Sequence, residues 1–409
     1  MLDKIVYAGT MNPSFEQASQ DLHKLAEVEV PTKQVERVTK RIGQERVEER
    51  DAAVQAHQAL PLTERKSVPE GMTAPEVAVV GCDGGRLQIF ERGGGAVEAE
   101  EATDVPAGRV GYWREDKIGL LMTMQSEESA RDPCPEIPEQ FVDPTRILKL
   151  ARELKKQRLP SEDAVTETAE PEVGVETLQE NREQWEPPEV KEKRLVGSRV
   201  RWPDFGPILA MMAWQWGFFG APRKAFIGDG SDNNWTIWRN HFSSFVPILD
   251  FIHALSYVFA AAMAGRSFAV GWPVYVEWIG WIWQGAVEKV IAALAQRQLE
   301  LGEPTSEDGE TSPRQIVASA LTYLQNHKEQ MRYADYRRLG LPITSSYVES
   351  AVKQFNQRVK GTEKFWSEEG AESILQLRAD HLSEDEPLHQ FWQDRQTKQT
   401  GQRHYRKAA

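Results

Sequence analysis

The stretch that decides the fold is EVAVVGCDGGRLQIFER, residues 76–92. Its first half is a run of β-branched and other apolar residues that ends at Asp83, which is typical of a buried strand. GRLQIFER then alternates between apolar and polar residues, and the Gly84-Gly85 pair between the two halves permits a tight turn. The pattern therefore predicts a β-hairpin with Asp83 at the end of its first strand.

Three further apolar runs have the length and composition of strands. KIGLLMTMQS, residues 117–126, predicts a third strand after the hairpin. KAFIGDG, residues 224–230, and FVPILD, residues 245–250, are short buried runs that again end at acids, Asp229 and Asp250. Strands of this kind leave an acidic side chain at the edge of a sheet.

Helices are predicted between and after these strands. Apolar residues at helical spacing indicate them at residues 204–219, 233–242 and 272–340, with an acidic loop at 303–310. A last helix starts at Ser345 or Ser346 and carries Glu349 in its first turn. The order is three antiparallel strands, helix, strand, helix, strand, helical insertion, helix. It fits an α/β fold, an RNase H-like mixed sheet with a large α-helical insertion.

An N-terminal helical region is expected over residues 1–70. Apolar spacing predicts helices within 14–58, with a turn and a helix start at Pro31 and Thr32. Helix, short turn, helix is compatible with a helix-turn-helix DNA-binding unit. An ordinary helical hairpin explains the same pattern and is the simpler interpretation.

The same patterns divide the rest of the chain. The core is expected in three pieces, residues 71–158, 201–265 and 344–395. The helical insertion is expected at 266–343, and a basic, flexible tail at 396–409. Residues 159–200 are rich in Glu and Pro and poor in large apolar side chains. Such a segment buries too little apolar surface to offset its ordering entropy, so we predict a disordered acidic insertion.

Composition narrows the class of protein. The formal net charge of −13 argues against a globally basic nucleic-acid coat, although a local basic surface can still bind DNA. Cys82 and Cys134 alone suggest neither a zinc site nor a disulfide framework, so a cytoplasmic, nucleoid-associated protein is expected. Charged residues interrupt the most apolar stretch, residues 245–283, which therefore predicts buried helices and no membrane contact.

Asp83, Asp229 and Glu349 are the candidate catalytic and metal-ligating residues. An RNase H-like sheet supplies one acid from its first strand, one from the end of its fourth strand and one from a later helix. Mg²⁺ prefers oxygen ligands, and two ions roughly 3.5–4 Å apart can activate the nucleophile and stabilise the leaving oxygen in phosphodiester cleavage. Each acid alone is equally well explained as a polar residue at the end of a strand.

Four blocks carry a resemblance to a known family: VVGCDGGRLQIFER, YWREDKIGLLMTM, KAFIGDGSDNNWTIWRNHFSSFVPILDFIHALSYVFAAA and SSYVESAVKQFNQRVKGTEKFW. The sequence resembles ISKra-type bacterial insertion-sequence transposases, which are DDE transposases, over most of residues 15–395. The resemblance implies an RNase H-like core and cleavage and strand transfer at element ends with two Mg²⁺ or Mn²⁺ ions. Carried over residue by residue, the acidic triad falls on Asp83, Asp229 and Glu349.

The resemblance also implies which partners the protein binds and how mobile the element is. The expected partner is DNA, as the terminal inverted repeats of the element and the target, bound by a homo-oligomer. Family members carry a longer segment ahead of the core for recognising element ends, so with residues 1–70 alone we expect a truncated or poorly mobile copy. The alternatives are an inactive remnant that only binds DNA, and another RNase H-like nuclease that cuts without joining ends.

Asp250 and His253 form a D-x-x-H element at the end of the predicted fifth strand. One interpretation places both near the active site, where they orient a ligand or contact a phosphate. The other makes Asp250 a helix N-cap and His253 a satisfied core histidine. The residues alone favour neither.

Basic and aromatic residues near the third acid are candidate DNA contacts, because cations neutralise phosphates and an aromatic ring can stack on an unpaired base. They are Lys353, Arg358, Lys360, Lys364 and Trp366, with Phe365 beside them, and Arg114 and Lys117 from the third strand. The alternative is a solvated helix face with a packed tryptophan.

Overall fold

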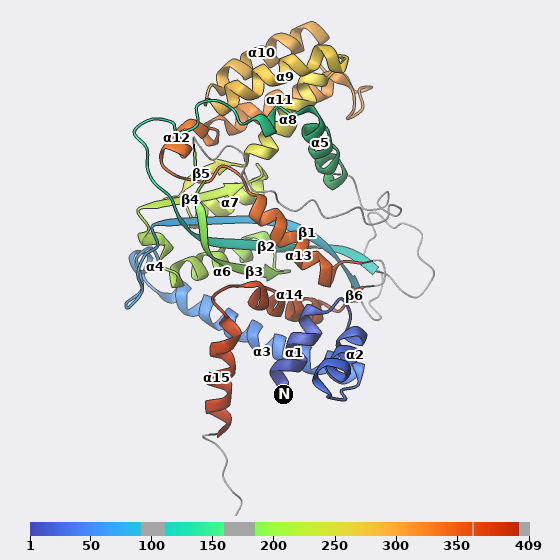
Figure 1. The fold of residues 1–409 in the computed structure, drawn as a ribbon, viewed down its shortest axis with the longest axis vertical. Helices are drawn as coiled ribbons and strands as arrows, with labels where there is room; N and C mark the ends of the chain where they lie inside the picture. The colour runs from blue at the N-terminus through green and yellow to red at the C-terminus, as the bar shows by residue number, and fades with distance from the viewer. Residues whose placement is uncertain (91–110, 159–184, 362–363, 401–409) are drawn as a thin grey trace, which may run out of the picture.

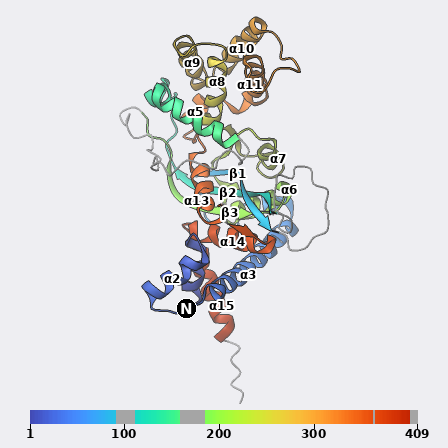
Figure 2. The ribbon, with the colours of Figure 1, turned by 90° about the vertical axis from the view of Figure 1, so that its right-hand side faces the viewer.

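The computed structural model describes residues 1–90, 111–158, 185–361 and 364–400 of the 409-residue chain. Over these residues the protein is a mixed α/β structure built on one mixed sheet (Figure 1). A group of helices caps one end of the molecule, and the N-terminal and C-terminal helices lie together at the other end (Figures 1 and 2).

The sheet has the strand order β3-β2-β1-β4-β5, and a short β6 pairs with β1. β1, β2 and β3 are antiparallel, whereas β4 and β5 run parallel to β1. The strands are β1 Val77–Phe90, β2 Gly111–Gln125, β3 Glu189–Ser198, β4 Arg223–Gly228, β5 Val246–Leu249 and β6 Phe365–Trp366. The predicted runs before Asp229 and Asp250 are therefore both strands.

The predicted hairpin within residues 76–92 is wrong. β1 continues through Gly84 and Gly85, and its antiparallel partner is β2. The two glycines instead leave space for side chains of the neighbouring strand. A Cβ on Gly84 would lie 2.9 Å from the Glu115 carboxylate, and one on Gly85 would lie 2.8 Å from that of Asp116. The two glycines make room for acids on β2, so no turn is needed to explain them.

β1 has different partners at its two ends on the side away from β2. It pairs with β4 as far as Gly81 and Ile227, and with β6 only at residues 88–89. Residues 82–87 have no strand partner on that side in the described part of the chain. Asp83 and Asp229 each follow the last β1–β4 pair by two residues, so both acids stand where the two strands separate.

Helices cover both faces of the sheet. α13 (Ser346–Val359) and α14 (Glu368–Leu382) pack on one face, and α6 (Trp202–Gln215) packs on the other. A Cβ on Gly81 would lie 2.8 Å from Val348 of α13. Because alternate residues of a strand share a face, the Asp83 side chain points to the α13 side.

The N-terminal helices are α1 (Leu2–Met11), α2 (Phe15–Ala26), α3 (Thr32–Ala59) and α4 (Leu62–Arg65). Of these, α1, α2 and α3 share a second hydrophobic core with three later residues: Leu377 of α14, and Leu388 and Phe391 of α15 (Pro387–Thr400). In Figure 1 the blue helices α1–α3 lie against the red helices α14 and α15. The N-terminal helical region is therefore packed against α14 and α15. Its helix α3 has 28 residues.

The helical insertion follows β5. It contains α8 (Phe251–Met263), α9 (Phe268–Trp283), α10 (Val287–Leu301), α11 (Pro313–His327) and α12 (Tyr333–Arg338), and α5 (Pro144–Arg158) contacts α8. No helix among the described residues is long and apolar enough to span a membrane. α7 (Asp232–His241) lies outside the insertion, between β4 and β5.

The acidic insertion is shorter than predicted. Residues 189–198, which the sequence placed in a disordered segment, form the edge strand β3. Its first part, residues 189–194, is mostly polar and only partly buried, but its end, Leu195 to Ser198, is buried against the sheet. Ladder hydrogen bonds to β2 and burial of this short end compensate for the polar composition. Residues 185–188 and 199–200 of the predicted segment are described as well, and residues 159–184 lie outside the described residues.

Arg337 fixes the helical insertion from within. It is fully buried, forms an ion pair with Asp132 at 2.5 Å, donates to the Trp283 carbonyl at 3.0 Å, and lies 4.0 Å from the centroid of the Trp283 ring. We expect Arg337→Ala to lower the free energy of unfolding by about 3–5 kcal/mol, because it removes a fully buried side chain and leaves the largely buried Asp132 carboxylate unpaired.

Urea unfolding monitored by tryptophan fluorescence measures this change. The neighbouring Arg338→Ala is the control, because its pair with Asp335 is exposed and should contribute less than about 1 kcal/mol. Equal losses in the two variants would contradict the anchoring role of Arg337.

Candidate functional site

Asp83, Asp229 and Glu349 come from three elements that meet at the gap beside β1. Asp229 directly follows β4 and Glu349 lies in the first turn of α13, as predicted from the sequence, whereas Asp83, predicted at the end of a strand, lies within β1. Asp83 points to the face that α13 covers. The topology thus brings the three predicted acids to one region.

The charges of these acids act on one another. The pKa of Asp83 is raised to about 7, first by burial and then by the negative charge of Asp229, with a smaller contribution from Glu349. The Gly84 N–H, which donates to Asp83 Oδ1 at 2.7 Å, and the nearby His253 oppose the rise. Burial and the neighbouring carboxylates therefore both disfavour the ionised form of Asp83, and His253 offsets part of this effect.

The carboxylate of Asp229 is held through one of its oxygens. Oδ1 accepts from the Ser231 N–H at 2.9 Å and from the Asn234 side-chain amide at 2.8 Å. The Cys82 thiol donates to the Asn234 oxygen at 3.1 Å, which fixes the orientation of that amide. Sequence reasoning missed Asn234. Its signal was its place three residues after Ser231, the N-cap of α7.

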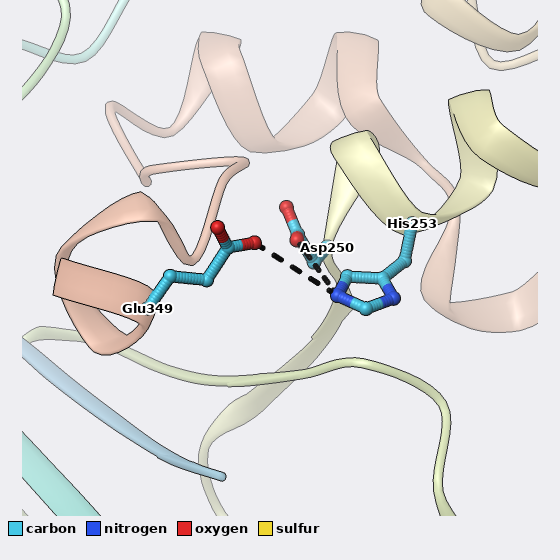
Figure 3. A group of neighbouring side chains, drawn as sticks. All are labelled: Asp250, His253 and Glu349. Carbon is cyan, nitrogen blue, oxygen red and sulfur yellow. Dashed lines mark ion pairs between the residues drawn. The ribbon is translucent and has the colours of Figure 1, made fainter. Parts of the chain in front are cut away.

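Glu349 lies next to Asp250 and His253, as Figure 3 shows. His253 Nε2 is 4.0 Å from Glu349 Oε1 and 3.8 Å from Asp250 Oδ2. One ligand atom from each of the three lies within 4.8 Å of the others, and this is the one such group found among the described residues. The second element that the sequence singled out therefore lies beside the third acid.

Asp250 is fully buried and already occupied by hydrogen bonds. Its Oδ1 accepts from the Ile252 N–H at 3.2 Å and the Ser345 N–H at 3.1 Å, and its Oδ2 accepts from the Ser345 hydroxyl at 2.8 Å. It caps α8, as one interpretation predicted, and it also fixes the residue that precedes α13. Asp250 therefore positions Glu349 and is poorly placed to bind a ligand itself.

Asp116 is an acid that the sequence reasoning did not single out. It is fully buried on β2, opposite Gly85, and within the described residues no other residue hydrogen-bonds to its carboxylate oxygens. Burial raises its pKa to about 6. Its own backbone N–H opposes the rise most, followed by Lys117 and Lys360, and Glu115 adds to it. Because Gly85 and Asp83 are two residues apart, Asp116 lies on the same face of the sheet as Asp83.

Three of the predicted DNA contacts are buried, and these predictions are wrong. Arg358 donates to the Gly9 and Pro13 carbonyls and lies against Phe15 and Trp366, so it joins α13 to the N-terminal helices. Trp366 donates to the Val359 carbonyl within this contact.

Lys117 is the third buried candidate. Its side chain pairs with Glu115 and lies over the Trp202 ring on the α6 side of the sheet. All three side chains support packing, because amphipathic groups bury their stems and rings where a partner satisfies the polar end.

The other candidates remain at the surface. Arg114, Lys353 and Lys360 are exposed, and Lys360 lies 5.9 Å from the centroid of the exposed Trp113 ring. Lys364 is partly buried and donates to the Gln357 carbonyl, and Phe365 is exposed. These residues lie around the end of α13 and the adjoining end of β1 and β2.

Comparison with known proteins gives no independent assignment. The chain matches no family model, and no curated protein sequence matches it.

Asp116→Asn tests the cost of the unpaired carboxylate. Its pKa in the folded state, about 6, lies above the ordinary value of 3.8, so ionisation destabilises the fold. The penalty is absent below pH 3.8, grows as the pH rises through 6, and is complete above it. We expect the variant to be more stable than wild type at pH 8, by about 3 kcal/mol in order of magnitude, and equal to it near pH 4.

Thermal unfolding at the two pH values measures this difference. The exposed Asp335→Asn should show no such gain at pH 8. A lower melting temperature of Asp116→Asn at pH 8 would mean that the carboxylate has a stabilising partner.

Proposed function

We propose that this protein is a DDE-type transposase with an RNase H-like core, which cleaves phosphodiester bonds and transfers strands at insertion-sequence ends. The observation that carries the proposal is the convergence of Asp83, Asp229 and Glu349 from β1, β4 and α13. Their mutual effect on the pKa of Asp83 supports it. The activity, the DNA partner and the metal dependence are proposals from this site and from the sequence resemblance.

The topology supports the RNase H-like assignment. An RNase H-like core is expected to have three antiparallel strands followed by two strands parallel to the first, with acids on the first strand, after the fourth and on a late helix. The order β3-β2-β1-β4-β5 and the places of the three acids agree with that expectation. The helical insertion between β5 and α13 agrees with the transposase type.

The residues of the site fit a hard divalent cation. The donors are carboxylate oxygens, which Mg²⁺ and Mn²⁺ prefer, and Asp83, Asp229 and Glu349 would hold the two ions. Burial, and then the charges of Asp229 and Glu349, raise the pKa of Asp83, so a bound cation would favour its ionised form. Bound ions would supply charge stabilisation to the attacking and leaving oxygens of the phosphodiester.

The protein's own groups prepare this chemistry. Ser231 and Asn234 orient the Asp229 carboxylate, and Asp250 holds the start of α13 so that Glu349 faces the gap. His253 lies 4.0 Å from Glu349 and can hold or donate a proton beside it. Arg114, Lys353 and Lys360 are the exposed cations suited to phosphate contacts, and a homo-oligomer would bring two DNA ends together.

Asp229→Asn tests the proposed activity. Purified protein is incubated with Mg²⁺ or Mn²⁺ and DNA that carries the inverted repeats flanking its own locus. We expect specific end cleavage and joining to a target plasmid by wild type, and loss of both by at least about 100-fold in Asp229→Asn, because one carboxylate ligand is removed. Asp204→Asn, an exposed acid of α6, is the control.

The outcomes separate the alternatives. Cleavage without joining would favour another RNase H-like nuclease. DNA binding without any cleavage by wild type would reduce the protein to a remnant, and the proposal of an active transposase would be wrong.

His253→Ala should reduce cleavage by about 10-fold or more and leave the melting temperature nearly unchanged, because the side chain lies beside the site at the edge of the core. Initial cleavage rates and thermal unfolding on the same preparations check this. Normal cleavage by the folded variant would remove His253 from the site.

A further inference from the structure

Tyr323 connects the helical insertion to the main chain of the candidate metal centre. It lies on α11, and its hydroxyl donates to the backbone carbonyl of Asp229 at 2.7 Å. Its ring covers Gly230, where a Cβ would lie 2.7 Å from Tyr323 Cε2. The insertion therefore contacts the backbone of Asp229, and it does so through a residue 94 positions further along the chain.

Gly230, which follows Asp229, makes the backbone at this contact unusually free to rotate. Its φ of +98° is a conformation that side chains other than glycine's rarely adopt. A glycine directly after Asp229 leaves the main chain free to rotate there, so the fold must restrain the loop from outside. Ser231 and Asn234 restrain the carboxylate, whereas Tyr323 restrains the carbonyl.

Two aromatic neighbours fix the Tyr323 ring. Tyr257 of α8 stacks on it with the centroids 3.8 Å apart and the planes at 14°. His327, one turn later on α11, meets it edge to face with the ring centroids 4.8 Å apart, and the Gly230 backbone acts on the pKa of His327. α11 thus contacts the Asp229–Gly230 segment with two side chains four residues apart, which share a face of the helix.

The helix that carries Tyr257 also carries a neighbour of the third acid. Tyr257 lies one helical turn after His253 on α8, so both side chains point from the same side of that helix. His253 in turn lies beside Glu349. The stacked pair therefore lies between the Asp229 loop and the side of α8 that carries His253.

We propose that Tyr323 is a positioning residue that holds Asp229 in its metal-binding orientation and so couples the helical insertion to the metal centre. The inference rests on the proposed function, since it presumes that Asp229 is a metal ligand. Groups that orient a ligand without touching the metal commonly change metal affinity by about 10–100-fold when they are removed.

The test is Tyr323→Phe, which removes the hydrogen bond to Asp229 and keeps the ring over Gly230 and on Tyr257. The matched control is Tyr275→Phe. Tyr275 lies in the same insertion, and its hydroxyl also donates to a backbone carbonyl, that of Phe141 at 2.8 Å. This contact lies outside the Asp229 loop. Binding of Mn²⁺ alone is measured on the full chain by titration calorimetry, and thermal unfolding confirms that both variants fold.

We expect Mn²⁺ to bind Tyr323→Phe about 10-fold more weakly than wild type, and Tyr275→Phe with unchanged affinity. In the cleavage assay the half-saturating Mn²⁺ concentration should rise in Tyr323→Phe, and the rate at saturating Mn²⁺ should stay near that of wild type.

Equal Mn²⁺ affinity of wild type and Tyr323→Phe would overturn the inference and leave the proposed function intact. Equal weakening in both variants would also overturn it, because the effect would then be a general loosening of the insertion. If wild type binds no Mn²⁺, the proposed function fails, and the role of Tyr323 fails with it.

Discussion

The parallel pairing of β1 with β4 stops at Gly81 and Ile227, and the arrangement of the candidate site depends on where it stops. Up to that pair the strands bury apolar residues, and the main chain satisfies its own hydrogen bonds. Beyond it the strands separate, and each carries an acid two residues later. Longer pairing would place Asp83 and Asp229 in a closed sheet, where carboxylates are costly without partners. A shorter ladder would leave them without a common position.

The third acid is set by contacts far apart in sequence. Asp250, at the end of β5, holds Ser345 at the start of α13 across 95 residues, and Phe251 donates to the Ile343 carbonyl beside it. The insertion leaves and returns at these two points. Its helices therefore begin and end at the site, which explains how α11 reaches the Asp229 loop. The site is a junction between the sheet and the insertion rather than a feature of the sheet alone.

Local patterns predicted the parts of the site that local sequence determines. The strands before Asp229 and Asp250 and the first-turn place of Glu349 follow from apolar runs and helix starts, which are properties of neighbouring residues. The role of Gly84 and Gly85 depended on Glu115 and Asp116 across the sheet, which no local pattern contains. Arg358 and Trp366 looked like surface residues because their partners, among them Gly9 and Phe15, lie at the other end of the chain.

The core shared by the N-terminal helices and the last two helices has a consequence for synthesis. Arg46 and Arg50 of α3 pair with Asp380 and Glu372 of α14, more than 300 residues later. On the ribosome, α1–α3 emerge long before those partners exist. At about 5–20 residues per second they wait tens of seconds with an apolar surface uncovered. Helices α1–α3 can adopt their packed positions only once α14 has been synthesised.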